Sequence, residues 1–196
     1  DIPLKNQDEK LLVVVSALGG ITNLLQKCLT LKGKSINYVI ENLEERHLEI
    51  INNLSDLKGR SSLKSFLKEK LNLLEDILDA ISTIDEVTKK TISKVLTIGE
   101  VLSSNIIYEI LKQRGFDITY INSSELIFTK DLNNIEVLDG DKSSIKIISK
   151  INSLKSSMVI APGFICSNAK GEVSDLGRGG SDYSAAIYAK YCNAKS

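Results

Sequence analysis

The fold is decided by the stretch LLVVVSALGGITNLLQKCL, residues Leu11–Leu29. It opens with an uninterrupted run of Leu and Val, which is typical of a strand covered on both faces, as parallel strands in α/β sheets are. Gly19 and Gly20 break this run, and apolar residues then recur at helical spacing from Ile21 onward. The stretch therefore predicts a strand, a small-residue turn and a helix, an arrangement that often forms a ligand site beyond the carboxyl end of the strand.

Strand and helix patterns alternate again in the second half of the chain. We expect a helix over 92–114 ending at Gly115, a strand over 116–121, a helix over 143–154, a buried strand over 158–161 stopped by Pro162, and an Ala-rich helix over 182–193. Such alternation is typical of a sheet with helices on its faces, so the predicted fold class is α/β.

The region between these α/β segments is helical in character. Apolar spacing predicts two amphipathic helices within 35–84, joined by a connection over 55–62 that contains Gly59. We interpret residues 32–90 as a helical insertion built around an antiparallel helical pair. His47 lies on the apolar stripe of the first helix, and with no Cys or His at ligand spacing we expect it to be a packing residue and predict no metal site.

Composition excludes several functional classes. The 196 residues carry 25 Lys and Arg against 25 Asp and Glu, so the chain lacks the basic footprint of a general nucleic-acid binder. No run approaches the roughly 20 apolar residues of a membrane span, and residues 1–5 have no signal-peptide core. The three cysteines, at 28, 166 and 192, are expected to be reduced thiols in the cytoplasm. Because the chain begins at Asp1 and its single Met is Met158, we expect either that a segment has been removed or that the chain is a piece of a longer protein.

The densest chemical pattern is LGRGGSDY, residues Leu176–Tyr183. Its glycines allow backbone N–H groups to approach a ligand, and Ser181 or Asp182 could cap the helix that follows. A helix N-terminus beside the Arg178 guanidinium is a receptor for a carboxylate or a phosphate. The alternative is a mobile hairpin tip with an exposed Arg. The pattern is neither a P-loop nor a dinucleotide fingerprint.

Two other places could contribute to a site. Ser16 and Thr22 flank the first glycine turn, where their hydroxyls could bind a ligand or simply cap the helix. Glu100 follows Gly99 between apolar positions of a predicted helix, where it could receive an ammonium or could equally be solvated.

These motifs together resemble the aspartate kinases. The similarity lies in residues 14–23, in Gly99 and Glu100, in residues 163–165 and in LGRGGSDYSAA at 176–186, and the motifs occur in the family's order. The resemblance covers roughly 11–31, 95–123 and 158–192. It implies the amino-acid-kinase fold, a three-layer α/β/α sandwich. It also implies that residues 1–196 are a partial catalytic domain, the amino-acid-binding lobe, without the nucleotide lobe or the regulatory ACT domains. The insertion at about 32–90 is similar to that of the lysine-sensitive or the homoserine-dehydrogenase-linked branches.

The resemblance further implies a reaction, the transfer of the γ-phosphoryl group of ATP to the β-carboxylate of L-aspartate. The product is 4-phospho-L-aspartate, the first step toward lysine, threonine and methionine. For the full-length parent it implies ATP and Mg²⁺ as cofactors, L-aspartate and ATP as partners, homo-oligomeric assembly, and a cytoplasmic location without nucleic-acid or membrane partners.

The resemblance also assigns residues to the site. Glu100 would receive the ammonium of aspartate and Arg178 a carboxylate, and Arg178 and Asp182 would be catalytic. The full set of implied substrate-binding residues is Ser16, Thr22, Glu100, Phe164, Arg178, Gly179, Gly180 and Ser181.

The sequence departs from the family in what it lacks. The family begins with a Lys-Phe-Gly-Gly-Thr-Ser segment that handles the transferring phosphate, and it continues into a Trp-Thr-Asp segment and a nucleotide lobe. Neither segment is in this sequence, so we expect the isolated chain to be inactive, and its nucleotide-binding residues are unassigned. Two alternatives stay open: another amino-acid kinase of the acetylglutamate or glutamate type, and a non-catalytic binding fragment whose helical block mediates assembly.

Overall fold

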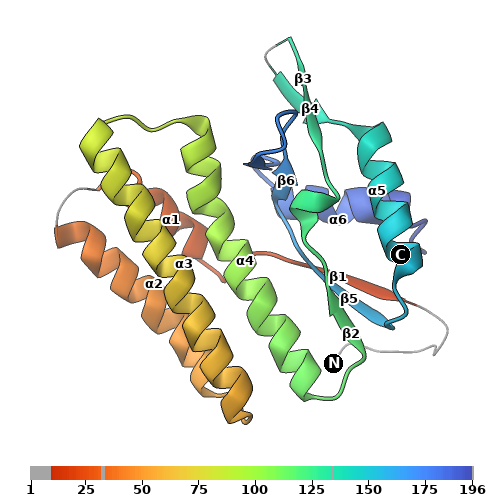
Figure 1. Ribbon diagram of the computed structural model, residues 1–196, viewed down its shortest axis with the longest axis horizontal. Coiled ribbons are helices and arrows are strands. Elements are labelled where there is room, and N and C mark those ends of the chain that lie inside the picture. The colour runs from red at the N-terminus through yellow and green to blue at the C-terminus, as the bar shows by residue number, and fades with distance from the viewer. Residues whose placement is uncertain (1–9, 32–33, 134, 196) are drawn as a thin grey trace.

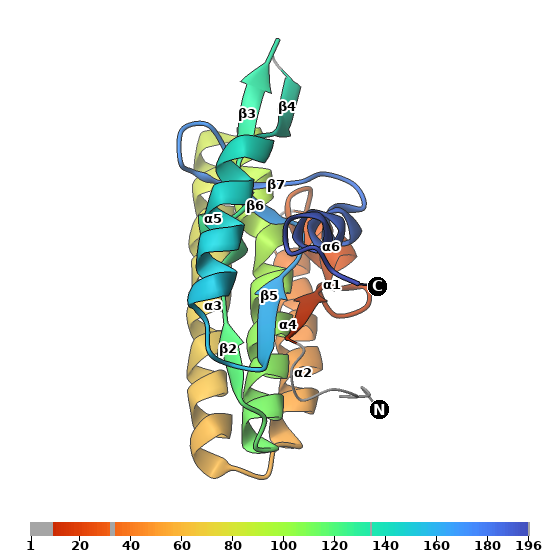
Figure 2. The same ribbon diagram turned by 90° about the vertical axis from the view of Figure 1, so that its right-hand side faces the viewer.

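Three parallel strands form the main sheet of the computed structural model, which describes residues 10–31, 34–133 and 135–195. Their order is β1 (Leu11–Val15), β5 (Met158–Pro162) and β2 (Ile118–Tyr120), with β5 in the centre (Figure 2). All residues of β5 are buried, as expected for this strand. Strand β1 lies at the edge of this sheet, and only its Val15 is fully buried. Its Leu11 and Val13 nevertheless pack in one apolar cluster and its Leu12 and Val14 in another, so the expectation that β1 is covered on both faces is confirmed.

Helices cover both faces of this sheet. Successive side chains of β5 point to opposite faces, and because all of them are buried, each face needs a cover. Val159 and Ala161 pack with residues of α5 (Gly140–Ser153) and α6 (Gly180–Tyr191). Met158 and Ile160 pack in a second cluster that includes residues of α4 (Lys89–Gln113). In Figure 1, α4 lies to the left of the sheet and α5 to its right. The predicted three-layer α/β/α sandwich is confirmed.

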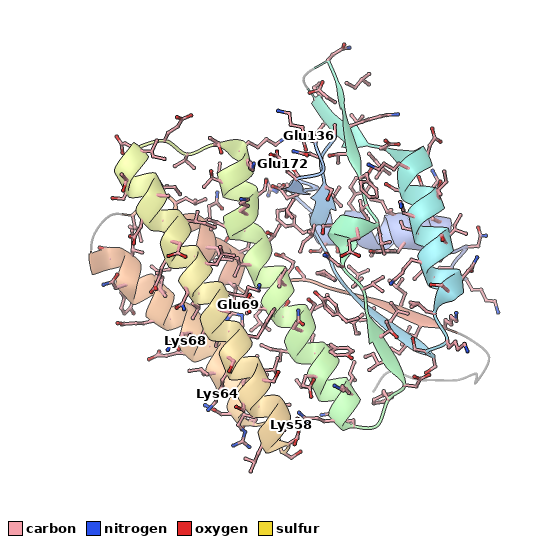
Figure 3. All side chains as sticks on the ribbon, viewed as in Figure 1. Lys58, Lys64, Lys68, Glu69, Glu136 and Glu172 are labelled. Carbon is pink, nitrogen blue, oxygen red and sulfur yellow. The ribbon has the colours of Figure 1, made fainter. Side chains whose placement is uncertain are left out.

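The other side of α4 belongs to a group of four helices, completed by α1 (Ile21–Cys28), α2 (Lys34–Asn52) and α3 (Leu57–Ile84) (Figure 1). These four helices, called the helical group below, share one apolar core. His47 is completely buried there, and its Nδ1–H donates to the Leu43 carbonyl at 2.6 Å, so its predicted packing role is confirmed. The outer face of α3 is charged and exposed, as the labelled lysines of Figure 3 show.

The connection predicted over 55–62 is wrong, because α3 already begins at Leu57. The Asp56 side chain caps it by accepting from the backbone N–H groups of Lys58 and Gly59. Gly59 therefore lies in the first turn of α3. A Cβ at Gly59 would collide with the Gln113 side chain and come within 2.7 Å of Glu109 Oε1, so this glycine serves helix packing and not a turn.

Other boundaries differ by a few residues, and two hairpins were not predicted. Helix α4 starts at Lys89 behind its cap Thr88, α5 starts at Gly140 behind its cap Asp139, and β2 is shorter than expected. The unpredicted hairpins are β3 (Thr129–Leu132) with β4 (Ile135–Leu138), and β6 (Ile165–Ser167) with β7 (Val173–Asp175); a short 3-10 helix, η1, spans Ser123–Glu125. Pairing with a partner strand stabilises these short, partly polar segments, which are too short to show a clear apolar periodicity.

Some expectations concern other properties of the chain. Cys28 and Cys166 are buried thiols and Cys192 is half-buried. Among the described residues no helix is long and apolar enough to cross a membrane. Residues 1–5, in which no signal-peptide core is expected, and residues 32–33 at the start of the predicted insertion lie outside the described residues.

Candidate active site

Two glycine-containing turns meet beyond the carboxyl ends of β1 and β5. Gly20 is the N-cap of α1 and Gly179 is the N-cap of α6; both have left-handed backbone conformations, with φ of 81° and 73°, and neither cap makes a side-chain hydrogen bond. An uncapped first turn presents backbone N–H groups and a partial positive charge to a ligand. The expectation that Ser181 or Asp182 caps α6 is wrong, because the helix begins at Gly180 and both residues lie inside its first turn.

The structure brings Ser16 and Ser181 together although they are far apart in the sequence. The Ser181 hydroxyl donates to Ser16 Oγ at 3.1 Å. Gly163 makes this approach possible, since a Cβ there would lie 2.8 Å from the Cβ of Ser181. The Gly163 N–H in turn donates to the Val15 carbonyl at 2.8 Å. The end of β1, the end of β5 and the start of α6 thus form one continuous rim.

Glu100 lies on α4 at the base of this rim and is only 3% exposed. Its Oε1 accepts a long hydrogen bond, 3.4 Å, from the Ala17 N–H, and its Oε2 is buried without a partner. Burial raises the pKa of Glu100 to about 7, and the negative charge of Asp175 adds to this increase. The alternative of a solvated Glu100 is therefore excluded. A buried carboxylate with a free oxygen can be satisfied by a cationic group of a ligand.

The position of Glu100 depends on the residue before it. A Cβ at Gly99 would lie 2.9 Å from the Ala17 Cβ and 3.3 Å from side-chain carbons of Ile21 and Leu25. Only glycine allows α4 to come this close to the turn between β1 and α1. The small residue thus sets the depth at which the carboxylate is buried.

Arg178 and Asp182 are exposed, and Thr22 is half-buried. Arg178 lies between Gly177 and Gly179, both with positive φ, on a loop that leads from β7 to α6, so the hairpin-tip alternative is wrong. No other described residue forms a hydrogen bond or ion pair with its guanidinium group. The guanidinium is therefore available to an anionic ligand.

Phe164 and Gly180 pack against each other behind this loop. Phe164 has φ of 66°, and its N–H donates to Ser184 Oγ at 2.9 Å. A Cβ at Gly180 would lie 2.6 Å from the Phe164 ring, so no larger residue fits there without a shift. This contact fixes the start of α6 against the end of β5.

Two residues at the site were missed by sequence reasoning. Asp175 accepts hydrogen bonds from the Gly177 N–H at 2.8 Å and from the Ser93 hydroxyl at 2.5 Å. Its spacing, an Asp two residues before a Gly, is that of a side chain that bonds its own backbone in a turn, and this pattern could have identified it. Arg46 of α2 donates to the Gly19 carbonyl at 2.6 Å, and no sequence pattern could have shown this long-range contact.

The residues at the start of α6 are suited to bind the phosphate of a nucleotide, and they are less suited to bind the Mg²⁺ that accompanies it. Backbone N–H groups at the start of α6 and the guanidinium of Arg178 are suitable donors to a phosphate. The described ranges contain no cluster of three or more His, Cys, Asp or Glu residues that could hold a metal ion. In kinases Mg²⁺ is held in large part by the phosphates of the substrate.

Comparison with known proteins gives consistent results. Residues 2–196 match the model of the amino acid kinase family. The chain is 28% identical over 193 residues to the bifunctional aspartokinase/homoserine dehydrogenase of Buchnera aphidicola, covering 96% of this chain and 24% of that protein. It is 30% identical over 193 residues to the aspartokinase of Chlamydia pneumoniae, covering 96% of this chain and 40% of that protein.

Solved structures show the same fold. Escherichia coli aspartokinase III in complex with aspartate and ADP aligns with a TM-score of 0.82 and 24% identity, and its complex with lysine and aspartate aligns with a TM-score of 0.82 and 25% identity. These alignments cover 94% and 93% of this chain, and each covers 40% of the solved chain. The chain thus spans less than half the length of the relatives it matches. Because the family model matches almost its whole length, the chain belongs to the amino acid kinase family.

Proposed function

We propose that this chain is the aspartate-binding lobe of an aspartate kinase. In the longer enzyme it transfers the γ-phosphoryl group of ATP to the β-carboxylate of L-aspartate and gives 4-phospho-L-aspartate, the first step toward lysine, threonine and methionine. The enzyme is a cytoplasmic homo-oligomer whose nucleotide lobe and regulatory domains lie outside these 196 residues, and residues 32–90 are its helical insertion. Support comes from the relatives named above, which are aspartokinases or include an aspartokinase part.

The observation that carries the proposal is the buried, half-satisfied carboxylate of Glu100. An α-amino dicarboxylate needs one acid for its ammonium, and Glu100 Oε2 is an unpartnered acceptor at the carboxyl end of β1. The ammonium would supply the missing hydrogen bond and the compensating charge. N-acetylglutamate has no ammonium, so this feature does not favour an acetylglutamate kinase.

The carboxylates of aspartate would be held at the opposite rim. Arg178 offers a planar guanidinium, and the uncapped start of α6 offers the backbone N–H groups of Gly179 and Ser181. The Gly180 N–H already donates to the Gly177 carbonyl at 2.9 Å, so Gly180 contributes through its close packing on Phe164. Ser16 and Thr22 add hydroxyls from the first turn, and Phe164 closes the wall behind them. Arg178 and the exposed Asp182 are the charged residues that flank the uncapped α6 terminus in the sequence, where we place the reacting carboxylate and the transferred phosphoryl group.

The chain's own part in the reaction is positioning and charge balance. Bound ATP with Mg²⁺ supplies the phosphoryl group, which a β-carboxylate oxygen of aspartate accepts while ADP leaves. The residues of this chain hold the amino acid by its ammonium, exclude water at Glu100, and direct amide and guanidinium donors toward the negative charge.

A comparison of L-aspartate with succinate tests the proposal. Succinate has both carboxylates but no ammonium, so the longer enzyme should use it with a KM at least about tenfold higher, as expected for a lost hydrogen bond to a charged group. Trapping of the acyl phosphate by hydroxylamine measures turnover. Glu100→Gln should remove most of the preference for L-aspartate over succinate, whereas Glu45→Gln, at an exposed position of α2, should retain it. Failure to form aspartyl hydroxamate with ATP, or equal use of succinate, would contradict the proposal.

A further inference from the structure

Asp175 links the glycine-rich loop that carries Arg178 to helix α4, which carries Glu100. It is the last residue of β7 and directly precedes the glycine-rich loop. Its Oδ1 accepts the Gly177 N–H at 2.8 Å, and its Oδ2 accepts the Ser93 hydroxyl at 2.5 Å. One carboxylate therefore connects the loop that carries Arg178 to helix α4.

Helix α4 also carries Glu100, two turns after Ser93 and on the same face. Ser93 is 1% exposed, and its hydroxyl also lies 3.1 Å from the Lys89 carbonyl, so its rotamer is fixed from both sides. The chain of contacts runs from Gly177 through Asp175 and Ser93 along one rigid helix to Glu100. The spacing between the loop and the acid is thereby defined by the fold.

The charges around Asp175 leave it without a cation. Lys89 of α4 pairs with Glu136 of β4 at 3.2 Å, and Lys90 pairs with Glu172 of the β6–β7 turn. Figure 3 shows Glu136 and Glu172 near the end of α4 at which these lysines lie. Among the described residues Asp175 forms no ion pair. Burial, together with the negative charge of Asp175, also raises the pKa of the Cys166 thiol of β6. Asp175 is thus a second negative charge close to Glu100.

We propose that Asp175 is a positioning residue for the amino-acid substrate: it fixes the glycine-rich loop relative to Glu100, and its charge makes the buried end of the site favour an ammonium. This role rests on the proposed function. It differs from a purely structural turn, because a turn needs only the hydrogen bond to Gly177, whereas the positioning role needs the bond to Ser93 and the negative charge as well.

Asp175→Asn separates charge from shape. The amide oxygen still accepts from Gly177, and Ser93 can rotate to accept from the amide nitrogen, so the fold should be retained. In the longer enzyme we expect the KM for L-aspartate to rise about tenfold with a smaller change in kcat. Ser93→Ala, which keeps the charge but frees the loop from α4, should raise the same KM several-fold. Glu172→Gln removes a charge from the same hairpin without touching the loop, and it should leave the KM unchanged.

A second measurement does not depend on the enzyme reaction. The carboxyl carbon of Glu100, followed by NMR in the ligand-free chain, should titrate at lower pH in Asp175→Asn than in the wild type, because a nearby negative charge has been removed. If the wild-type enzyme does not phosphorylate aspartate, the proposed function fails, while this titration still reports on the coupling of Asp175 to Glu100. The positioning role is overturned if Glu100 titrates at the same pH in Asp175→Asn as in the wild type. It is also overturned if the wild-type enzyme phosphorylates aspartate and Asp175→Asn has the same KM for it.

Discussion

At the scale of single residues, Glu100 is the feature that most clearly separates a binding site from ordinary packing. Its carboxylate is desolvated, accepts one long hydrogen bond and retains one oxygen without a partner. Such an arrangement destabilises the charged form and is uncommon where no ligand compensates it. A raised carboxyl pKa beside a second acid is typical of functional sites.

The raised pKa of Glu100 predicts how stability depends on pH. The unfolded chain titrates near 4.5 and the folded protein near 7, so the unfolded state loses its proton first as pH rises. Between these two values the folded state is progressively destabilised, by about 3 kcal/mol in full at 1.36 kcal/mol per pKa unit. Glu100→Gln removes this penalty. We therefore expect its stability relative to wild type to increase from pH 4 to pH 8 in urea unfolding.

The control for this measurement is Glu69→Gln. Glu69 lies on the exposed face of α3 and is distant from Glu100 in the sequence. Its stability difference from wild type should stay nearly constant over the same range. A Glu100→Gln curve parallel to that of the wild type would contradict the burial of an ionisable carboxylate at this position.

At the scale of elements, long segments were predictable and short ones were not. Continuous apolar runs placed β1 and β5, and apolar spacing placed α4 within a few residues and α3 apart from its first turns, which were assigned to a connection. The hairpins β3–β4 and β6–β7 were missed because they are short and partly polar, and only a partner strand stabilises them. Among site residues, Ser16, Glu100 and Ser181 could be named from motifs. Arg46 could not, because its contact depends on how two helices pack.

A substitution at Gly99 tests how closely α4 packs on α1 and on the turn before it. Gly99→Ala places a Cβ 2.9 Å from the Ala17 Cβ, and both atoms belong to short side chains that cannot rotate away. Overpacking of this kind usually costs about 1–3 kcal/mol, which exceeds the gain of up to about 1 kcal/mol from the helix propensity of Ala. We expect a net loss of about 1–2 kcal/mol in the free energy of unfolding, measured by urea denaturation.

Gly19→Ala is the matched substitution. Nothing lies within 4 Å of a Cβ at Gly19, and its φ is not in the left-handed region, so the change should be tolerated within about 0.5 kcal/mol. Equal losses for the two variants would mean that the close approach of α4 to the β1–α1 turn does not exist in solution.

At the scale of the whole molecule, α4 is shared between two cores. One face of α4, from Val95 to Ile110, packs in the helical group, and another face, at Ile107, Tyr108 and Leu111, packs on the sheet. The buried Glu100 of the same helix lies at the site. The helical group is therefore not an independent appendage. A movement of α2 or α3 can therefore shift the residues of the candidate site, because α4 packs on both helices. A second connection is a contact from α2 to the turn at Gly19.

That contact is the Arg46 guanidinium on the Gly19 carbonyl, at 2.6 Å, and it gives a test of the link between the helical group and the site. Arg46 is exposed, so Arg46→Ala should change the free energy of unfolding by no more than about 1 kcal/mol. The turn that presents Thr22 and the start of α1 should nevertheless loosen, and we expect the KM for L-aspartate in the longer enzyme to rise about threefold to tenfold. Glu45→Ala, on the neighbouring exposed position of α2, should leave this KM unchanged. If both variants behave alike, the helical group stabilises the lobe without ordering its substrate turn.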